Sequence, residues 1–86
     1  MNQKARMLAK YLRGTMGPAA YDLIEGGTLY YGEIPGFEGV YARAGQLEAC
    51  RGELEEVLEE WLLLRISKNL PIPEVDGVRL TIREVV

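Results

Sequence analysis

The chain has 86 residues, of which 48% are hydrophobic, and 10 lysines and arginines against 13 acidic residues give it a net charge of −3. This composition excludes a disordered chain, and no apolar run approaches the ~18–20 residues that a membrane-spanning helix needs. A domain of this size buries only roughly 60–65% of the surface that its unfolded chain exposes, so association with another chain is expected to bury more.

Charge is distributed unevenly along the chain. The first 14 residues contain four cations and no acid, a local charge of +4, so the net charge of −3 leaves −7 for residues 15–86. An acidic body disfavours phosphate binding over most of the surface and favours a basic protein as partner.

The chain has one cysteine, Cys50, and no histidine. A lone cysteine forms no internal disulfide, and no charged-then-apolar leader with a cleavage site precedes the domain, so we expect a cytoplasmic protein. Without an imidazole base, Cys50 is interpreted as a small buried hydrophobe rather than a nucleophile. The absence of a Cys/His cluster predicts neither a metal nor a cofactor.

Residues 2–15 have the periodicity of a helix. One face of it is apolar and includes Leu8, Leu12 and Met16. Another face is cationic and consists of Arg6, Lys10 and Arg13. This cationic face is a candidate for binding nucleic-acid phosphates, but a solvated face near acidic residues is favoured because three cations make few phosphate contacts.

From Ala20 the periodicity falls to two residues, which predicts strands. A hairpin is expected in which Gly26-Gly27 supplies the positive φ of the turn and residues 29–34 return as a tyrosine-rich strand. After the loop that begins at Pro35-Gly36, residues 40–44 form a third short strand. The three strands are expected to form an antiparallel meander.

The segment Gln46 to Leu70 is the longest helical pattern. Its predicted core stripe comprises Leu47, Cys50, Leu54, Val57, Leu58, Trp61 and Leu64, and its glutamates lie mostly elsewhere. Four residues point away from this stripe, namely Leu62, Leu63, Ile66 and Leu70. Because exposing them would leave an unusual apolar patch, we expect this patch, or the open face of the sheet, to form a homo-oligomer, a dimer or tetramer.

Beyond this helix, Pro71 and Pro73 enforce an extended connector, Asp76-Gly77 forms a turn, and residues 78–83 alternate as a fourth strand. The predicted class is therefore α+β in the order α-β-β-β-α-β, with the fourth strand after a crossover helix. Residues 1–17 form the N-terminal basic helix and residues 18–86 the rest of a single compact domain.

Three segments carry a resemblance to a known family. They are the run YGEIPGFEGV over residues 31–40, the helix positions Leu47-Glu48, Cys50, Glu56, Leu58 and Trp61-Leu62, and the exit Pro71-Ile72-Pro73-Glu74. In order and spacing they resemble the HicB-like antitoxin family over residues 20–84. The resemblance implies a truncated ribonuclease-H-like β-β-β-α-β domain, to which the N-terminal helix is an addition.

The chain departs from the family pattern at several positions. Ala44-Gly45-Gln46 replaces the usual Gly-Asp-Thr, so Gly45 is expected to stand in for a side-chain N-cap. Glu38 replaces the second proline of the loop. The C-terminal helix-turn-helix or ribbon-helix-helix module that binds operator DNA in many members has no counterpart in residues 1–86.

Catalysis is not expected. A ribonuclease-H site gathers carboxylates from the first strand, the helix and the last strand around two metal ions. Here Asp22 lies in the first strand and Glu48 or Glu53 on the helix, but the last strand carries Arg79, Thr81 and Arg83. The order α-β-β-β-α also occurs in double-stranded-RNA-binding domains. These domains need basic residues at the start of their last helix, where this chain has Glu48 and Glu53, so we reject this alternative.

The resemblance implies a non-catalytic antitoxin that neutralises a small basic RNA-cleaving toxin of the HicA type by protein contact. The alternatives are a stand-alone oligomeric HicB-like protein without a toxin, or a weak nucleic-acid-binding regulator. The candidate contact surface comprises Glu33, Ile34, Pro35, Phe37 and Glu38. Within it, Phe37 is either an exposed anchor or a cap on the core.

Overall fold

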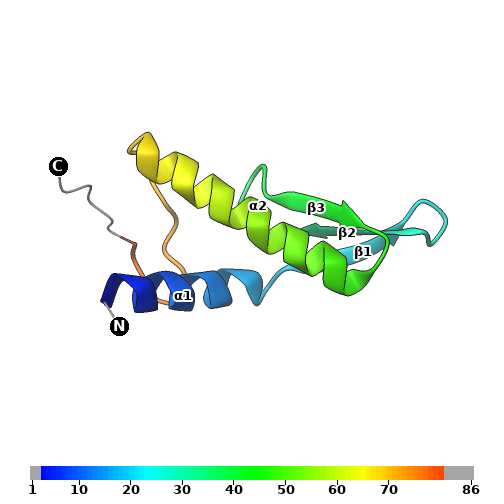
Figure 1. The fold of residues 1–86 in the computed structure, drawn as a ribbon, viewed down its shortest axis with the longest axis horizontal. Coiled ribbons are helices and arrows are strands. Elements are labelled where there is room, and N and C mark those ends of the chain that lie inside the picture. The colour runs from blue at the N-terminus through cyan, green and yellow to red at the C-terminus, as the bar shows by residue number, and fades with distance from the viewer. Residues whose placement is uncertain (1–2, 81–86) are drawn as a thin grey trace.

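The computed structural model describes residues 3–80, and its elements follow the predicted order as far as the long helix. Helix α1 (Gln3–Met16) precedes strands β1 (Ala20–Ile24), β2 (Leu29–Glu33) and β3 (Tyr41–Ala44), and helix α2 (Leu47–Ser67) follows them. The molecule is elongated, with extents of 49 × 25 × 20 Å. The sheet and the first half of α2 lie at one end, and α1 and the second half of α2 lie at the other (Figure 1).

The three strands form an antiparallel sheet in the order β1-β2-β3, which confirms the predicted meander. The β1–β2 turn uses positive φ at Glu25 (51°), Gly26 (67°) and Gly27 (86°). The amides of Gly27 and Thr28 each donate to the carbonyl oxygen of Ile24 at 3.2 Å. Gly26-Gly27 therefore makes the hairpin as predicted, because glycine adopts this backbone region at no steric cost.

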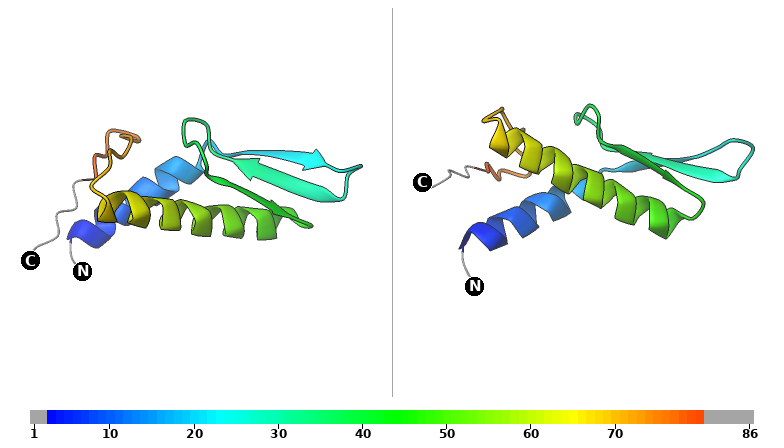
Figure 2. Two further views of the ribbon diagram at one scale, coloured as in Figure 1. Left: turned by 90° about the horizontal axis from the view of Figure 1, so that it is seen from above. Right: turned by 45° about the horizontal axis from the view of Figure 1, so that its top comes forward.

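One face of the sheet packs against α2, and small residues allow the close approach. Gly32 pairs with Tyr21, and a Cβ atom on Gly32 would lie 2.9 Å from the Tyr21 ring and 3.2 Å from Cys50 Sγ. Because side chains alternate between faces, Tyr31 and Asp22 point to the opposite face. No element within residues 3–80 covers that opposite face (Figure 2).

The buried side of α2 differs from the predicted stripe. Its buried residues recur every fourth position, at Cys50, Leu54, Leu58 and Leu62. Leu47 and Leu64, predicted to be core residues, are 43% and 53% exposed. Leu62, predicted to point away from the core, is 2% exposed. The stripe follows one inclined i, i+4 ridge because α2 leaves the sheet halfway along its length and α1 then covers the next turn.

Both ends of α2 differ slightly from the prediction. The N-cap is Gln46 rather than Gly45, with φ −130°, and its side chain makes no capping hydrogen bond. At the other end the amides of Asn69 and Leu70 donate to the carbonyls of Ile66 (3.1 Å) and Arg65 (2.8 Å). With Asn69 at φ 57°, this is a Schellman motif, so α2 ends at Ser67 instead of continuing to Leu70.

Helix α1 packs between α2 and the connector that follows it. Tyr11 and Thr15 are completely buried, and the Tyr11 hydroxyl donates to the Pro73 carbonyl oxygen at 2.6 Å. A Cβ atom on Gly14 would meet Val75 at 3.1 Å. The predicted apolar face of Leu8, Leu12 and Met16 is only half-buried. Because α1 packs against both α2 and the connector, burial is complete at Tyr11, which lies between these three residues and the connector side of the helix.

The predicted fourth strand is not seen within the described residues, and residues 81–86 lie outside them. Asp76-Gly77 forms the predicted turn, with φ values of 49° and 74°. It joins Val75 and Val78, which make an isolated bridge. Val78 and Leu80 are buried in the core, and Figure 1 shows this segment beside α1. In residues 78–80 the alternation therefore accompanies burial next to α1, and no pairing with the sheet is seen there.

Candidate functional site

The β2–β3 loop, residues 34–40, is held rigidly by two successive turns. The Phe37 amide donates to the Ile34 carbonyl at 3.1 Å, and the Val40 amide donates to the Phe37 carbonyl at 3.2 Å. Gly36 and Gly39 supply φ values of 85° and 87°. Ile34, Phe37 and Val40 all point inward and are buried.

Phe37 is a core residue rather than an exposed anchor. It is 8% exposed, and its ring lies 5.2 Å from that of Trp61 between centroids, tilted by 57°. Of the five residues predicted to form the contact surface, Ile34 is also buried, and the exposed ones are Glu33, Pro35 and Glu38. The inward residues therefore anchor the loop, and only the outward ones are available to a partner.

Two tyrosines extend the exposed side of this loop onto the open face of the sheet. Tyr31 and Tyr41 stack with ring centroids 6.1 Å apart and an interplanar angle of 26°, and Tyr41 is 51% exposed. The Tyr31 hydroxyl donates to Glu33 Oε2 at 3.3 Å. Desolvation, and then the charge of Glu33, raise the pKa of Tyr31.

These side chains surround a hollow of about 260 Å³, lined by the loop, Tyr31, Glu33 and Tyr41. We call this surface, with Glu38, the tyrosine–glutamate surface. Sequence reasoning missed its two tyrosines. The available signal was the pair Tyr30-Tyr31, because adjacent strand residues point to opposite faces and one of the two rings had to face away from α2.

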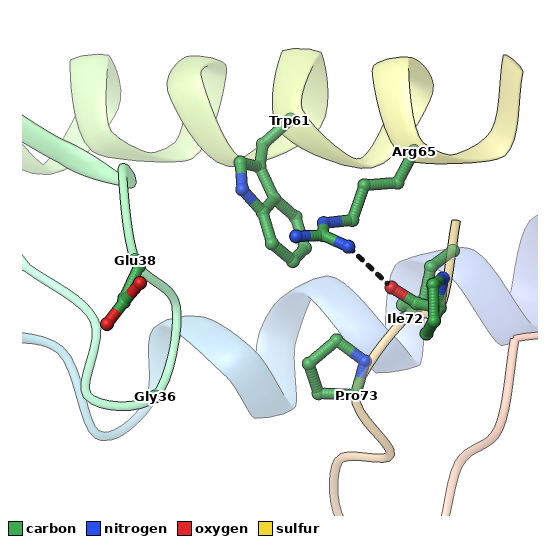
Figure 3. Close-up of a pocket in the computed structure, with 7 residues that line it drawn as sticks. Gly36, Glu38, Trp61, Arg65, Ile72 and Pro73 are labelled. Atoms are coloured by element: carbon green, nitrogen blue, oxygen red, sulfur yellow. Dashed lines mark hydrogen bonds between the residues drawn. The ribbon is translucent and has the colours of Figure 1, made fainter. Parts of the chain in front are cut away.

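A second cleft lies on the other side of the loop, with a volume of about 600 Å³ (Figure 3). The Arg65 guanidinium lies 4.4 Å from the centroid of the Trp61 ring and donates to the Pro71 carbonyl oxygen at 3.0 Å. Glu38 lies across the cleft from Arg65 (Figure 3). Opposite charges thus line its two sides, and the cation–π contact holds Arg65 in place.

The candidate nucleic-acid residues Arg6, Lys10 and Arg13 are all exposed on α1. Among residues 6–80 the one ion pair joins Arg79 to Glu74, at 4.0 Å. Within these residues the cations of α1 therefore form no ion pair with the glutamates of α2.

The four residues predicted to form an oligomer interface separate into different environments. Leu62 is buried, Leu63 is 66% exposed, Ile66 is half-buried, and Leu70 is 44% exposed beyond the end of α2. Leu62, Leu63 and Ile66 line a groove of about 290 Å³ between the two helices, together with Leu8, Leu12 and Glu59. Leu70 does not contribute to this groove.

The carboxylates considered for catalysis are not brought together. Asp22 lies on the open face of the sheet, whereas Glu48 and Glu53 belong to α2, which covers the other face. Within the described part of the chain no group of three metal-ligating side chains is found. Cys50 is buried, with Sγ 3.6 Å from two backbone carbonyl oxygens, and burial raises the pKa of its thiol.

No helix within residues 3–80 is both long and apolar enough to cross a membrane.

A comparison with protein families places this chain. The UPF0150-like family model matches residues 10–73, which is most of the chain. The chain belongs to the UPF0150-like family. This confirms the resemblance to HicB-like antitoxins, and HicB-like UPF0150 proteins are generally non-catalytic. The matched region starts within α1 and ends at Pro73, so it contains both partners of the Tyr11–Pro73 hydrogen bond.

Among solved structures, the UPF0150-like chain is similar to the crystal structure of TTHA0281 from Thermus thermophilus. The two share 37% sequence identity and a TM-score of 0.82, over 91% of this chain and 96% of the other. A search of curated proteins found no match.

Proposed function

We propose that this UPF0150-like chain is a non-catalytic, antitoxin-like binding module that neutralises a small basic RNA-cleaving toxin of the HicA type by covering its surface. The observation that carries this proposal is the tyrosine–glutamate surface. It combines two stacked tyrosines with exposed carboxylates on a loop that is fixed from inside by Phe37. This combination suits a cationic protein surface better than a nucleic acid, whose phosphates the carboxylates would repel.

The tyrosines and glutamates would contribute differently to binding. Tyrosine is enriched among the residues that dominate protein interfaces, because it buries a large rigid ring and retains a polar end. Exposed carboxylates act mainly on the rate of encounter with a cationic partner. The two backbone turns of the loop reduce the ordering cost of association, since the surface is already in one conformation.

Co-expression with the product of the adjacent open reading frame, followed by copurification and a growth-rescue assay, tests the proposal. In that assay Tyr41→Ala is expected to weaken the complex by at least about tenfold, the range of an interface hot spot. Leu23→Ala is the matched control, since Leu23 is 55% exposed at the other end of the sheet. Both variants should keep the wild-type melting temperature.

The carboxylates have a separate test. Replacing Glu33 and Glu38 together by Gln is expected to slow association most at low salt, where the Debye length is longest. The matched control replaces Glu56 and Glu60, which are exposed on α2. If only the α2 pair alters the association rate, the contact surface is the acidic face of α2. Failure of the neighbouring product to copurify or to be inhibited would contradict the toxin-binding proposal and favour a stand-alone HicB-like protein.

A further inference from the structure

The cleft between the β2–β3 loop and the connector after α2 contains two opposite charges that do not pair. Arg65 lies on one side of it and Glu38 on the other (Figure 3). Within residues 6–80 the one ion pair joins Arg79 to Glu74, so neither Arg65 nor Glu38 has a charged partner there. The volume of about 600 Å³ lies in the range of about 300–1,000 Å³ that is typical of ligand sites. We call it the Arg65–Glu38 cleft.

The guanidinium group of Arg65 is held in one orientation before a ligand binds. It lies 4.4 Å from the centroid of the Trp61 ring, and one of its terminal nitrogens donates to the Pro71 carbonyl oxygen at 3.0 Å. A guanidinium has five N–H donors in a rigid plane. Its other terminal nitrogen lies on the side facing Glu38 (Figure 3). Arg65 is therefore oriented to donate hydrogen bonds to an anionic group inside the cleft.

Both walls of the cleft are fixed by hydrogen bonds. The loop wall, which carries Glu38, is held by the hydrogen bonds of the Phe37 and Val40 amides at 3.1 and 3.2 Å. The connector wall is held at Pro73, whose carbonyl oxygen accepts from the Tyr11 hydroxyl at 2.6 Å. Because the walls are already ordered, a ligand that binds between them pays a smaller entropic cost of ordering the protein.

We propose that the Arg65–Glu38 cleft binds a short zwitterionic peptide, whose α-carboxylate accepts hydrogen bonds from Arg65 and whose α-ammonium group donates to Glu38. A simple anion would be repelled by Glu38. A simple cation would be repelled by Arg65, which also occupies the face of the Trp61 ring. A ligand with both charges has an attractive partner on each side of the cleft.

The shape of the cleft specifies the ligand further. Because Arg65 and Glu38 are too far apart to pair with each other, the two charges of the ligand must be separated, as they are at the ends of a dipeptide or tripeptide. Trp61, Ile72 and Pro73 line the space between the charged residues. Proline has no amide N–H, and an aromatic ring contributes a large apolar surface. The middle of the peptide is therefore expected to carry an apolar side chain.

This inference goes beyond the proposed toxin contact, and the purified chain alone is sufficient to test it. Glu38 lines both the cleft and the hollow of the tyrosine–glutamate surface. A bound peptide would therefore compete with a protein partner for this carboxylate. Absence of a toxin would leave peptide binding unchanged, so the two proposals fail separately.

Fluorescence titration tests the ligand class, because Trp61 is the one tryptophan of the chain and lines the cleft. The tripeptide Ala-Leu-Ala with free ends is expected to cause a saturable change in emission. Acetylating its amino end or amidating its carboxyl end should each raise the dissociation constant at least about tenfold, since each change removes a charge-assisted hydrogen bond. No saturable change at millimolar peptide, or equal affinities of free and capped peptides, would overturn the proposal.

Substitutions in the cleft test the orientation of the peptide. Arg65→Gln is expected to weaken the free peptide at least about tenfold and to abolish the difference between the free and amidated peptides. Glu38→Gln should likewise abolish the difference between the free and acetylated peptides. Arg51→Gln and Glu33→Gln are the matched controls, because both residues are exposed and neither lines the cleft. These controls should bind the free peptide like the wild type.

The combination of variant and peptide forms a double-mutant cycle, which isolates each pairwise contact. If amidation weakens binding to Arg65→Gln as much as to the wild type, Arg65 does not hold the carboxylate and the proposal is wrong. Glu38 is exposed, so Glu38→Gln should keep the wild-type melting temperature and provides the same test if Arg65→Gln does not fold. An undiminished effect of acetylation in Glu38→Gln would contradict the proposal in the same way.

Discussion

Phe37 stabilises the fold from inside the β2–β3 loop. Its ring packs on Trp61 and is 8% exposed, so Phe37→Ala is expected to cost roughly 3–5 kcal/mol of unfolding free energy through lost burial and a residual cavity. Urea denaturation measures this cost. Pro35→Ala, at an exposed position of the same loop, is the control and should change stability by less than about 1 kcal/mol.

Gly32 sets how closely α2 approaches the sheet. Since a Cβ atom there would lie 2.9 Å from the Tyr21 ring, Gly32→Ala is expected to destabilise the protein by about 1–3 kcal/mol through overpacking. Gly52→Ala, at a position on α2 where a Cβ would contact nothing within 4 Å, should instead stabilise it by up to about 1 kcal/mol, because alanine is the better helix former. Thermal unfolding measures both effects: Gly32→Ala should lower the midpoint temperature and Gly52→Ala should raise it.

The exposure of the predicted contact residues was only partly predictable from sequence. Glu33, Pro35 and Glu38 are exposed as a partner surface requires, but Phe37 is buried. The sequence shows that the loop contains an aromatic residue but not which way its side chain points. Side chains in a loop do not alternate regularly between two faces. The Tyr31–Tyr41 stack depends on the register of β2 against β3, and a register is fixed only once both strands are paired.

At the scale of elements, the end of α2 depends on one backbone conformation. Asn69 has φ 57° at the C′ position of the Schellman motif, a region that asparagine and glycine tolerate and alanine does not. Asn69→Ala is therefore expected to lower stability by about 1–2 kcal/mol, and Asn69→Gly to leave it unchanged or raise it. Lys68→Ala, with φ −97°, is the control. Equal effects of Ala and Gly at position 69 would contradict this assignment.

The sequence predicted local elements well and their tertiary environments less well. The meander, its Gly26-Gly27 turn and both helices follow from periodicity and turn chemistry, which act over a few residues. The prediction for Leu62 failed because its burial depends on α1 and the connector, which are distant in sequence. Val78 and Leu80 alternate with an exposed residue as in a strand, yet they pack beside α1. Alternation alone does not specify which element the apolar side chains pack against.

At the scale of the whole molecule, nucleic-acid binding is expected to be weak. The chain has a net charge of −3, and within residues 6–16 of α1 the exposed cations are Arg6, Lys10 and Arg13. Each phosphate contact adds about −0.9 to the slope of log K against log salt, so the slope for duplex DNA should be shallow. Replacing all three cations by Ala should remove most of it. Tight, sequence-specific binding would reveal a role for α1 that its charges do not account for.

The hydrogen bond from Tyr11 to Pro73 joins residues 62 positions apart in the chain. During synthesis α1 leaves the ribosome before the connector that buries Tyr11, and the residues between them emerge at about 5–20 per second. For several seconds α1 therefore has no complete site to occupy, and its apolar face is available to chaperones or to neighbouring nascent chains. Closure of this end is a late, non-local step, so slowed translation after residue 67 should lengthen the time during which the nascent chain is sensitive to protease.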